Sequence, residues 1–310
     1  MLNIFKNNNI DFMSGRKIAM FFSLVLIIIS IGSLATRSLN FGIDFTGGTL
    51  VEVGYPQSAD IATIKTALEK GGYAEASVVH FGSTKEVLIR VAPREGVTQN
   101  KIGSEVFAAL ASTSENLKLR RSEYVGPQIG EELTEKGGLA MLYALIGILI
   151  YVALRFEYRF SIGSVAALVH DVLITLGFFS VTQYEFDLTV LAALLAVIGY
   201  SLNDTIVVYD RIRENFRRMR KGTPVDVMNV SINHTLSRTL VTSLTTLLVL
   251  LALFFIGGEA IHGFSMALLT GVLIGTYSSI YVASTVALKL GVSKADLMPV
   301  EKEGEEFEGP

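Results

Sequence analysis

The stretch Ile18–Ala35, which reads IAMFFSLVLIIISIGSLA, decides the fold class of this chain. It carries no charge, and its 18 residues approach the ~20 apolar residues that a helix needs to cross a bilayer. A secretory signal peptide is the alternative, because Arg16 and Lys17 precede the run and Ser33-Leu34-Ala35 resembles a cleavage site. The apolar part of a signal peptide is shorter, ~7–15 residues. We therefore interpret the stretch as a retained membrane helix.

Five further stretches have the same character. Half of the 310 residues are apolar and only 18% are charged, against about 25% in an average soluble domain. The sequence therefore predicts a polytopic α-helical membrane protein with six transmembrane helices. The six predicted spans are Ile18–Thr36, Gly138–Leu154, Ile162–Val181, Leu188–Tyr209, Thr239–Ile256 and Gly263–Leu288.

Lys and Arg gather in alternate connections between these spans. The short turns 182–187 and 257–262 contain neither residue, whereas the connections 155–161 and 210–237 are basic. Basic short loops stay in the cytoplasm, so both termini are predicted to be cytoplasmic. The predicted order is a cytoplasmic N-terminus at 1–17, a first span at 18–37, a periplasmic domain at 38–136, five spans at 137–290 with a basic cytoplasmic loop at 210–237, and an acidic cytoplasmic tail at 291–310. We expect the Glu-rich end of this tail, Glu301–Pro310, to be disordered.

The long segment at 38–136 predicts a small ferredoxin-like α/β domain. Its strands and helices alternate in the order β-α-β-β-α-β, which defines that arrangement. The periodicity of apolar residues predicts strands at Thr49–Tyr55, Ala76–Phe81, Glu86–Val91 and Leu117–Val125, and helices at Ser58–Lys70 and Thr98–Ala111.

Several classes of function are disfavoured by what the sequence lacks. The net charge of −3 argues against a nucleic-acid binder, and the absence of Cys removes thiolate metal sites and thiol nucleophiles. There is no phosphate-binding loop for ATP and no histidine spacing typical of a metal site. We expect neither an enzyme nor a resident cofactor or metal, so energy for any work must come from a membrane gradient or a partner.

Asp204 and Arg238 are the strongest candidates for function. Charged side chains inside a bilayer cost ~2.5–3.5 kcal/mol on insertion scales, and so each requires an explanation. Asp204 lies near the end of the fourth span and Arg238 opens the fifth, which returns from the same side. A proton-responsive carboxylate–guanidinium pair is therefore feasible. The structural alternative is that Arg238 extends to the interface while Asp204 caps a polar helix end.

Three further polar residues within the spans are secondary candidates. His170 could relay protons, although we favour a hydrogen-bonded packing role. Asp171 is expected to make a polar contact inside the bundle. Asn203 is expected to form a hydrogen bond between helices.

The sixth span carries small residues at every fourth position, which predicts close helix packing. The stripe consists of Ala267, Gly271, Gly275, Ser279, Ala283 and Ala287.

The basic stretch 210–221 also contains Ile212 and Phe216. It could lie on the membrane surface against anionic lipid, or it could simply fix the topology.

Four sequence strings together resemble the SecF branch of the SecD/SecF family of protein-export membrane proteins, which belongs to the RND superfamily. The resemblance covers nearly the whole chain, from the first span to the sixth. The strings are FGIDFTGGT at 41–49, VGPQIG at 125–130, IGYSLNDTIVV at 198–208 with YDRIREN at 209–215, and TLSRTL at 235–240.

The resemblance implies a function in the Sec pathway. A SecF protein pairs with SecD and associates with the SecYEG translocon and YajC in the bacterial inner membrane. The complex uses the proton motive force to promote translocation of preproteins. Carried over to this sequence, Asp204 and Arg238 match the family's functional residues in the fourth and fifth spans. Two alternatives remain: a proton-coupled RND-type efflux component for small molecules, and a passive scaffold that stabilises the channel.

Overall fold

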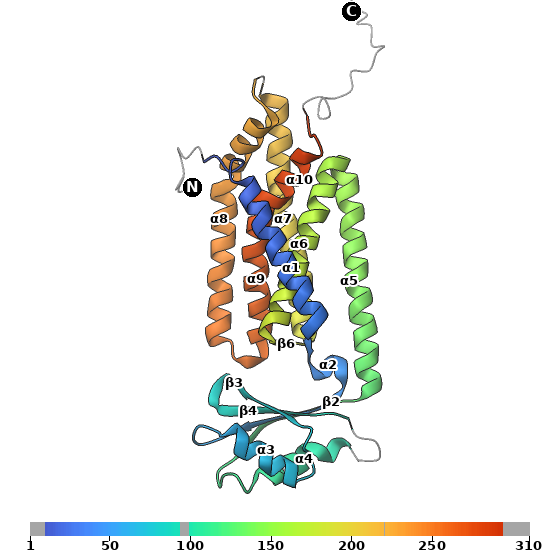
Figure 1. Ribbon diagram of the computed structural model, residues 1–310, viewed down its shortest axis with the longest axis vertical. Helices are drawn as coiled ribbons and strands as arrows, with labels where there is room; N and C mark the ends of the chain where they lie inside the picture. Colours follow the sequence, from blue (N-terminus) through green and yellow to red (C-terminus); the bar gives the residue numbers. More distant parts are fainter. Residues whose placement is uncertain (1–9, 94–98, 220, 294–310) are drawn as a thin grey trace, which may run out of the picture.

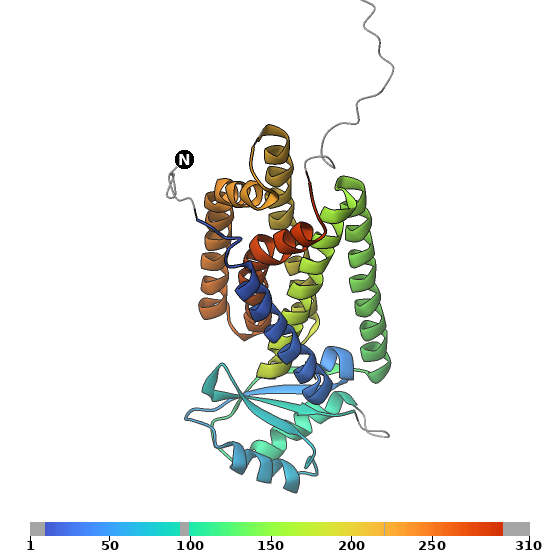
Figure 2. The same ribbon diagram turned by 45° about the horizontal axis from the view of Figure 1, so that its top comes forward.

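The computed structural model consists of a helical bundle with a small α/β domain at one end (Figure 1). It describes residues 10–93, 99–219 and 221–293. The predicted acidic tail at 291–310 lies almost wholly outside these residues. The first long helix begins, and the last one ends, at the end of the bundle opposite the α/β domain (Figures 1 and 2).

All six predicted spans are helices long and apolar enough to cross a membrane. The sixth consists of α9 (His262–Ser278), a π-helical turn η2 (Ser279–Ala283) and α10 (Ser284–Lys289), and it follows a short 3-10 turn η1 (Glu259–Ile261). The other five are α1 (Arg16–Arg37), α5 (Pro127–Arg155), α6 (Tyr158–Thr182), α7 (Leu188–Arg218) and α8 (Pro224–Ile256).

Three of these helices extend well beyond their apolar runs, and this corrects two predicted boundaries. The segment 210–237, predicted as a basic loop, is mostly helical, because α7 continues to Arg218 and α8 starts at Pro224. A capping box between Thr223 and Asp226 holds the start of α8. The predicted domain 38–136 likewise includes the first ten residues of α5. Hydropathy marks only the part of a helix that apolar residues occupy, whereas backbone hydrogen bonds continue through polar ones.

The bundle has three inner and three outer helices. About half of each apolar segment of α6, α7 and α9–α10 is buried within the chain, whereas at most 17% is buried in α1, α5 and α8. The exposed side chains of the outer helices are largely Leu, Ile, Val and Phe. Such surfaces are stable against lipid or against another membrane protein.

The small-residue stripe of the sixth span packs against α7. A Cβ at Gly271 would lie 2.1 Å from Val197 Cγ2, and one at Gly275 would lie 3.1 Å from Ser201 Cβ. All six residues of the stripe are buried. The two backbones therefore approach too closely for larger side chains at Gly271.

The α/β domain has the predicted ferredoxin-like topology. Two helices, α3 (Ile61–Lys70) and α4 (Gln99–Leu110), cover the face of the sheet turned away from the bundle (Figure 1). Its antiparallel sheet has the order β3-β4-β2-β5, formed by β2 (Gly48–Gly54), β3 (Ser77–Phe81), β4 (Ser83–Val91) and β5 (Lys118–Val125).

Alternation along the strands gives the sheet two apolar faces. Val51 and Val53 of β2 pack in the core under α3 and α4, whereas Leu50, which directly precedes Val51, contacts Ile43 and Leu88 on the opposite face. A strand with residues buried on both sides is consistent with its central position in the sheet.

A short connection ties this domain to the bundle. The strand β1 (Asn40–Phe41) pairs in parallel with β6 (Glu185–Phe186), which lies between α6 and α7. A single helical turn, α2 (Ile43–Thr46), follows, and Gly47 and Gly48 then turn the chain into β2 with φ of 68° and 126°. Conformations with positive φ favour glycine, which explains the Gly-Gly pair. None of β1, α2 and β6 was predicted, since two-residue strands and a single helical turn are too short to show a periodicity.

Arg90 and Glu185 form an ion pair across the same junction. Arg90 belongs to β4 and Glu185 to β6, and both side chains are largely buried, with exposed fractions of 18% and 25%. Asp44 adds a second contact, because its carboxylate accepts a hydrogen bond of 3.0 Å from the Leu188 amide at the start of α7. The domain is thus held directly by the helix that carries Asp204.

We predict that Gly271→Leu destabilises the bundle by about 1–3 kcal/mol, because the new side chain overlaps Val197. Gly147→Leu on α5 is the matched control, since a Cβ there meets no atom within 4 Å. Thermal unfolding of the two purified variants in the same detergent measures the difference. Equal melting temperatures would contradict the close contact between α7 and α9.

We also predict a pH-dependent loosening of the domain in Arg90→Met. Burial raises the pKa of the Glu185 carboxyl above its ordinary value, while Arg90 acts in the opposite direction. Removing Arg90 raises that pKa further, so the docked state retains a proton that a solvated Glu185 would release. Below the ordinary pKa of Glu, pH therefore does not change the docking of the α/β domain in Arg90→Met. As the pH rises from there towards the raised pKa of Glu185, the docked state becomes less stable.

Hydrogen exchange of the Gly42 amide reports this loosening, because that amide donates to the Phe186 carbonyl at 2.9 Å. The control is Arg120→Met, which breaks the Arg120–Glu86 pair inside the domain. The exchange rates are corrected for intrinsic exchange. If the Gly42 amide then exchanges with the same pH profile in both variants, Arg90 does not hold the junction.

Candidate functional site

Two carboxylates lie buried in the middle of the helical bundle. Asp204 of α7 is 7% exposed and Asp171 of α6 is fully buried. An isolated buried charge is very costly, and so buried acids are held by hydrogen bonds or neutralised. The contacts of the two groups therefore define the candidate site.

Both oxygens of Asp204 accept hydrogen bonds from hydroxyl groups. Thr239 of α8 donates to Oδ1 at 2.9 Å, and Ser279 of η2 donates to Oδ2 at 2.7 Å. Asp204 thus joins three helices at one point.

Asp171 is held by a larger set of groups. Ser201 of α7 and Ser278 of α9 both donate to its Oδ2, the latter at 2.7 Å. Its Oδ1 lies 2.7 Å from Nδ1 of His170, and Nε2 of His170 lies 3.0 Å from Ser23 Oγ in α1. The His170 ring is 2% exposed and has hydrogen-bond partners at both nitrogens.

The two carboxylates share the same supporting elements. Ser201 and Asp204 lie one turn apart on α7, and Ser278 and Ser279 are consecutive at the end of α9. Ser279 also begins the π-helical turn η2. Such turns occur often at functional sites, because they alter the helical register locally.

Arg238 and Asn203 do not join this cluster within the chain. Both side chains are exposed, and no ion pair connects Arg238 to Asp204 among the described residues. Thr239, the neighbour of Arg238, contacts Asp204 instead. The expected guanidinium–carboxylate pair is therefore absent in this arrangement, and Asn203 faces outward rather than towards another helix of this chain.

Sequence reasoning identified the acids but not the hydroxyl groups that hold them. Thr239, Ser201, Ser278 and Ser23 were not singled out, and Ser279 was assigned only to packing. The available signal was the position of Ser201 one turn before Asp204 and the Ser278-Ser279 pair inside an apolar span.

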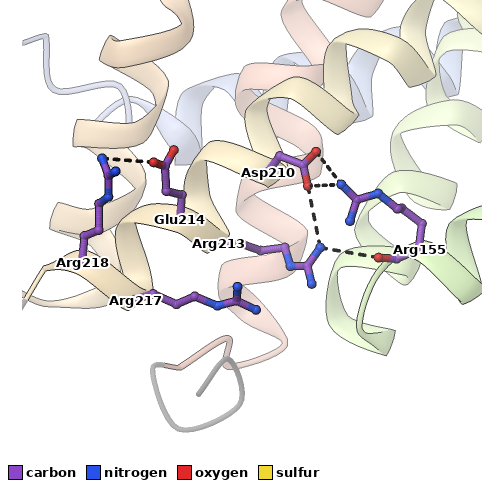
Figure 3. A pocket seen from close by; sticks show the side chains of 6 residues that line it. All are labelled: Arg155, Asp210, Arg213, Glu214, Arg217 and Arg218. Carbon is purple, nitrogen blue, oxygen red and sulfur yellow. Dashed lines mark hydrogen bonds and ion pairs between the residues drawn. The ribbon is translucent and has the colours of Figure 1, made fainter. Parts of the chain in front are cut away.

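A basic pocket of about 500 Å³ lies at the end of the bundle away from the α/β domain. Arg155 at the end of α5 donates two hydrogen bonds to Asp210, and Arg213 lies 3.7 Å from the same carboxylate (Figure 3). The residues that line the pocket are Arg155, Asp210, Arg213, Glu214, Arg217 and Arg218. Arginines thus outnumber acids in this lining.

The helix α7 runs continuously through this basic stretch. Ile212 and Phe216 are buried in the bundle core rather than exposed to lipid. This contradicts the hypothesis that 210–221 lies flat on a membrane surface and favours a role of its arginines in topology.

The described residues contain no group of three or more His, Cys, Asp or Glu side chains that could hold a metal ion. The buried cluster itself contains two carboxylates, several hydroxyl groups and one imidazole, which can form hydrogen bonds and exchange protons.

Comparison with known families identifies the chain's relatives. Residues 105–293 match the family model "Protein export membrane protein SecD/SecF, C-terminal". The chain belongs to the SecD/SecF family. Residues 32–59 match the SecD/SecF GG motif, a segment that includes Gly47 and Gly48 of the junction. Asp204, Asp171 and their hydrogen-bond partners on α6–α9 all lie within the larger match.

Curated relatives match along nearly their whole length. Protein translocase subunit SecF of Vibrio alginolyticus is 56% identical, with 99% of each chain covered. The SecF subunit of Pseudomonas aeruginosa is 49% identical, with 95% of each chain covered.

A solved structure supports the fold. The crystal structure of SecDF, a translocon-associated membrane protein from Thermus thermophilus, superposes with a TM-score of 0.83 at 37% identity and covers 94% of this chain. This chain spans only 39% of that SecDF polypeptide.

Proposed function

We propose that this chain is an accessory subunit of the Sec protein translocase that works together with a SecD-type partner. The full-length match to SecF subunits carries this proposal. The likeness to part of a longer SecDF chain supports a partner that supplies the remainder. The apolar outer faces of α1, α5 and α8 offer the surfaces for such a contact.

The proposed energy source is the proton motive force, with Asp204 as the proton-responsive group. Its two hydroxyl partners can donate to a carboxylate and can also tolerate a carboxylic acid, since each hydroxyl both donates and accepts. Asp204 can therefore change its protonation state without leaving a buried polar group unpaired.

Arg238 is proposed to act on Asp204 in another arrangement of the complex. It lies beside Thr239 on the exposed face of α8, next to the site rather than in it. A shift of α8 upon partner contact would bring the guanidinium to the carboxylate, which favours the charged form of Asp204.

We further propose that the complex includes SecYEG and YajC, that it acts on translocating preproteins, and that it resides in the bacterial inner membrane with both termini in the cytoplasm. The α/β domain then lies in the periplasm, where a preprotein emerges. The arginines around Asp210 lie at the opposite end, which agrees with the preference of basic residues for the cytoplasmic side. Neither an enzymatic activity nor a cofactor forms part of this proposal.

The orientation predicts asymmetric chemical labelling. Cysteine introduced at Ser83, an exposed residue of the α/β domain, should react with an impermeant thiol reagent added to cells whose inner membrane is intact. Cysteine at Lys221, exposed between α7 and α8, should react only after the cells are lysed. The chain's lack of native Cys removes background labelling. Reaction of both sites in intact cells would refute the orientation.

The proton-coupling proposal predicts that substitutions at Asp204 and at Arg238 each reduce preprotein export. Asp204→Asn preserves the size of the side chain but removes its titration, and it should abolish the gradient-dependent increment of preprotein export while assembly with the partner continues. Arg238→Lys should impair export because it lacks the planar fork of arginine, and Arg238→Met should impair it more.

Export into inverted vesicles, with and without a proton gradient and normalised to assembled complex, measures this increment. Thr242→Val is the matched control, since Thr242 is an exposed residue of α8 whose hydroxyl bonds only to backbone carbonyls. A passive scaffold predicts that each defect follows loss of assembly, and a full increment in assembled Asp204→Asn would exclude the proton-responsive role.

A further inference from the structure

The direction of each hydrogen bond around His170 follows from one tyrosine. The hydroxyl of Tyr277 lies 2.6 Å from the carbonyl oxygen of Ala19. A carbonyl oxygen only accepts hydrogen bonds, so Tyr277 donates its single hydroxyl proton in this bond. Tyr277 must therefore accept in its other contact, which joins it to Ser23 Oγ at 3.0 Å.

The same reasoning fixes the proton on His170. Ser23 uses its one proton on Tyr277 and can only accept from His170 Nε2, which lies 3.0 Å away. Nε2 is therefore protonated. The chain of bonds runs from His170 through Ser23 and Tyr277 to the α1 backbone, where α1 crosses the face of the bundle (Figure 1).

The contact between His170 and Asp171 then requires one more proton. Nδ1 and Oδ1 lie 2.7 Å apart, so a hydrogen must lie between them. An imidazolium beside a carboxylate and an imidazole beside a carboxylic acid both satisfy this requirement. In either form the pair is neutral overall and stores one proton.

Release of that proton to water leaves a neutral imidazole with Nε2–H and a carboxylate. Two lone pairs would then face each other across 2.7 Å, in a site where both side chains are at most 2% exposed. Ser201 and Ser278 still donate to Oδ2, but among the described contacts no Lys or Arg reaches the pair. The other titratable groups nearby are Tyr277 of α9 and Asp204 of α7. The pair must therefore rearrange when it loses its proton.

We propose that His170 and Asp171 form a second proton-carrying site within this chain, distinct from Asp204. The pair is connected to the first site by the consecutive residues Ser278 and Ser279, which each donate to one of the two carboxylates. A rearrangement at Asp171 shifts Ser278, and the π-helical turn that begins at Ser279 allows the helix to change register there. This coupling to export rests on the proposed function, whereas the shared proton does not.

Nitrogen NMR of ¹⁵N-histidine-labelled chain, assembled with its SecD-type partner in proteoliposomes, tests the shared proton directly. The signals of His170 are assigned by their loss in His170→Gln, which leaves the other three histidines. We expect Nε2 to be protonated at every pH at which the complex is folded and Nδ1 to change in one step. In Asp171→Asn that step should disappear, because the shared proton has no second acceptor. An unprotonated Nε2, or the same Nδ1 step in Asp171→Asn, would overturn the proposal.

Export assays test the coupling. Asp171→Asn and His170→Gln should each reduce the gradient-dependent increment about tenfold or more per assembled complex. Thr175→Val is the matched control, since its buried hydroxyl lies one turn along α6 but bonds only to the Asp171 backbone carbonyl. If Asp171→Asn does not assemble with the partner, export by His170→Gln alone tests the coupling. The amide of Gln can still donate a hydrogen bond to Ser23.

The two proposals fail in different ways. A full increment in assembled Asp204→Asn refutes the proposed function but leaves the NMR result on the pair intact. Loss of the increment in Asp204→Asn with full retention in both pair variants refutes the second site alone.

Discussion

The close approach of α9 to α7 is the constraint on which the rest of the bundle depends. Gly271 and Gly275 leave so little space that Val197 and Ser201 lie directly against the α9 backbone. Only at this separation can short serine side chains at 278 and 279 span the gap to Asp171 and Asp204. Because a buried carboxylate needs such donors, helix packing and proton chemistry depend on the same few small residues.

The fold was largely predictable from the sequence, because its signals are long and repetitive. Six apolar runs and an alternating β-α-β-β-α-β segment each extend over many residues, and the structure confirms both. The junction was not predictable. The β1–β6 pair joins Asn40 to Glu185 and Phe41 to Phe186, residues that are far apart in the sequence, and the Arg90–Glu185 ion pair and the Gly42–Phe186 hydrogen bond support it.

The candidate site was predictable only in part, and the reason is physical. Acids inside an apolar span are conspicuous, and therefore Asp204 and Asp171 could be named from the sequence. Ser and Thr are common in spans, so Thr239 is not distinguished until the helices are placed side by side, and Ser201 is marked only by its position one turn before Asp204. The expected pairing of Asp204 with Arg238 followed from their similar depth, but depth does not determine which face of α8 a side chain occupies, and Arg238 lies on the exposed one.

The position of α1 has a consequence for how the protein is made. Ser23 and Ser30 are buried only because α6 and α9 cover them: Ser23 contacts His170 and Tyr277, and Ser30 fits against Gly177. His170 follows Ser23 by 147 residues, so α1 leaves the ribosome roughly 7 to 30 s before its partner is synthesised at ~5–20 residues per second. During biogenesis the first helix therefore spends this interval in the membrane before the helices that bury Ser23 and Ser30 exist, and its two hydroxyls can then bond only to the backbone of α1 itself or to other molecules.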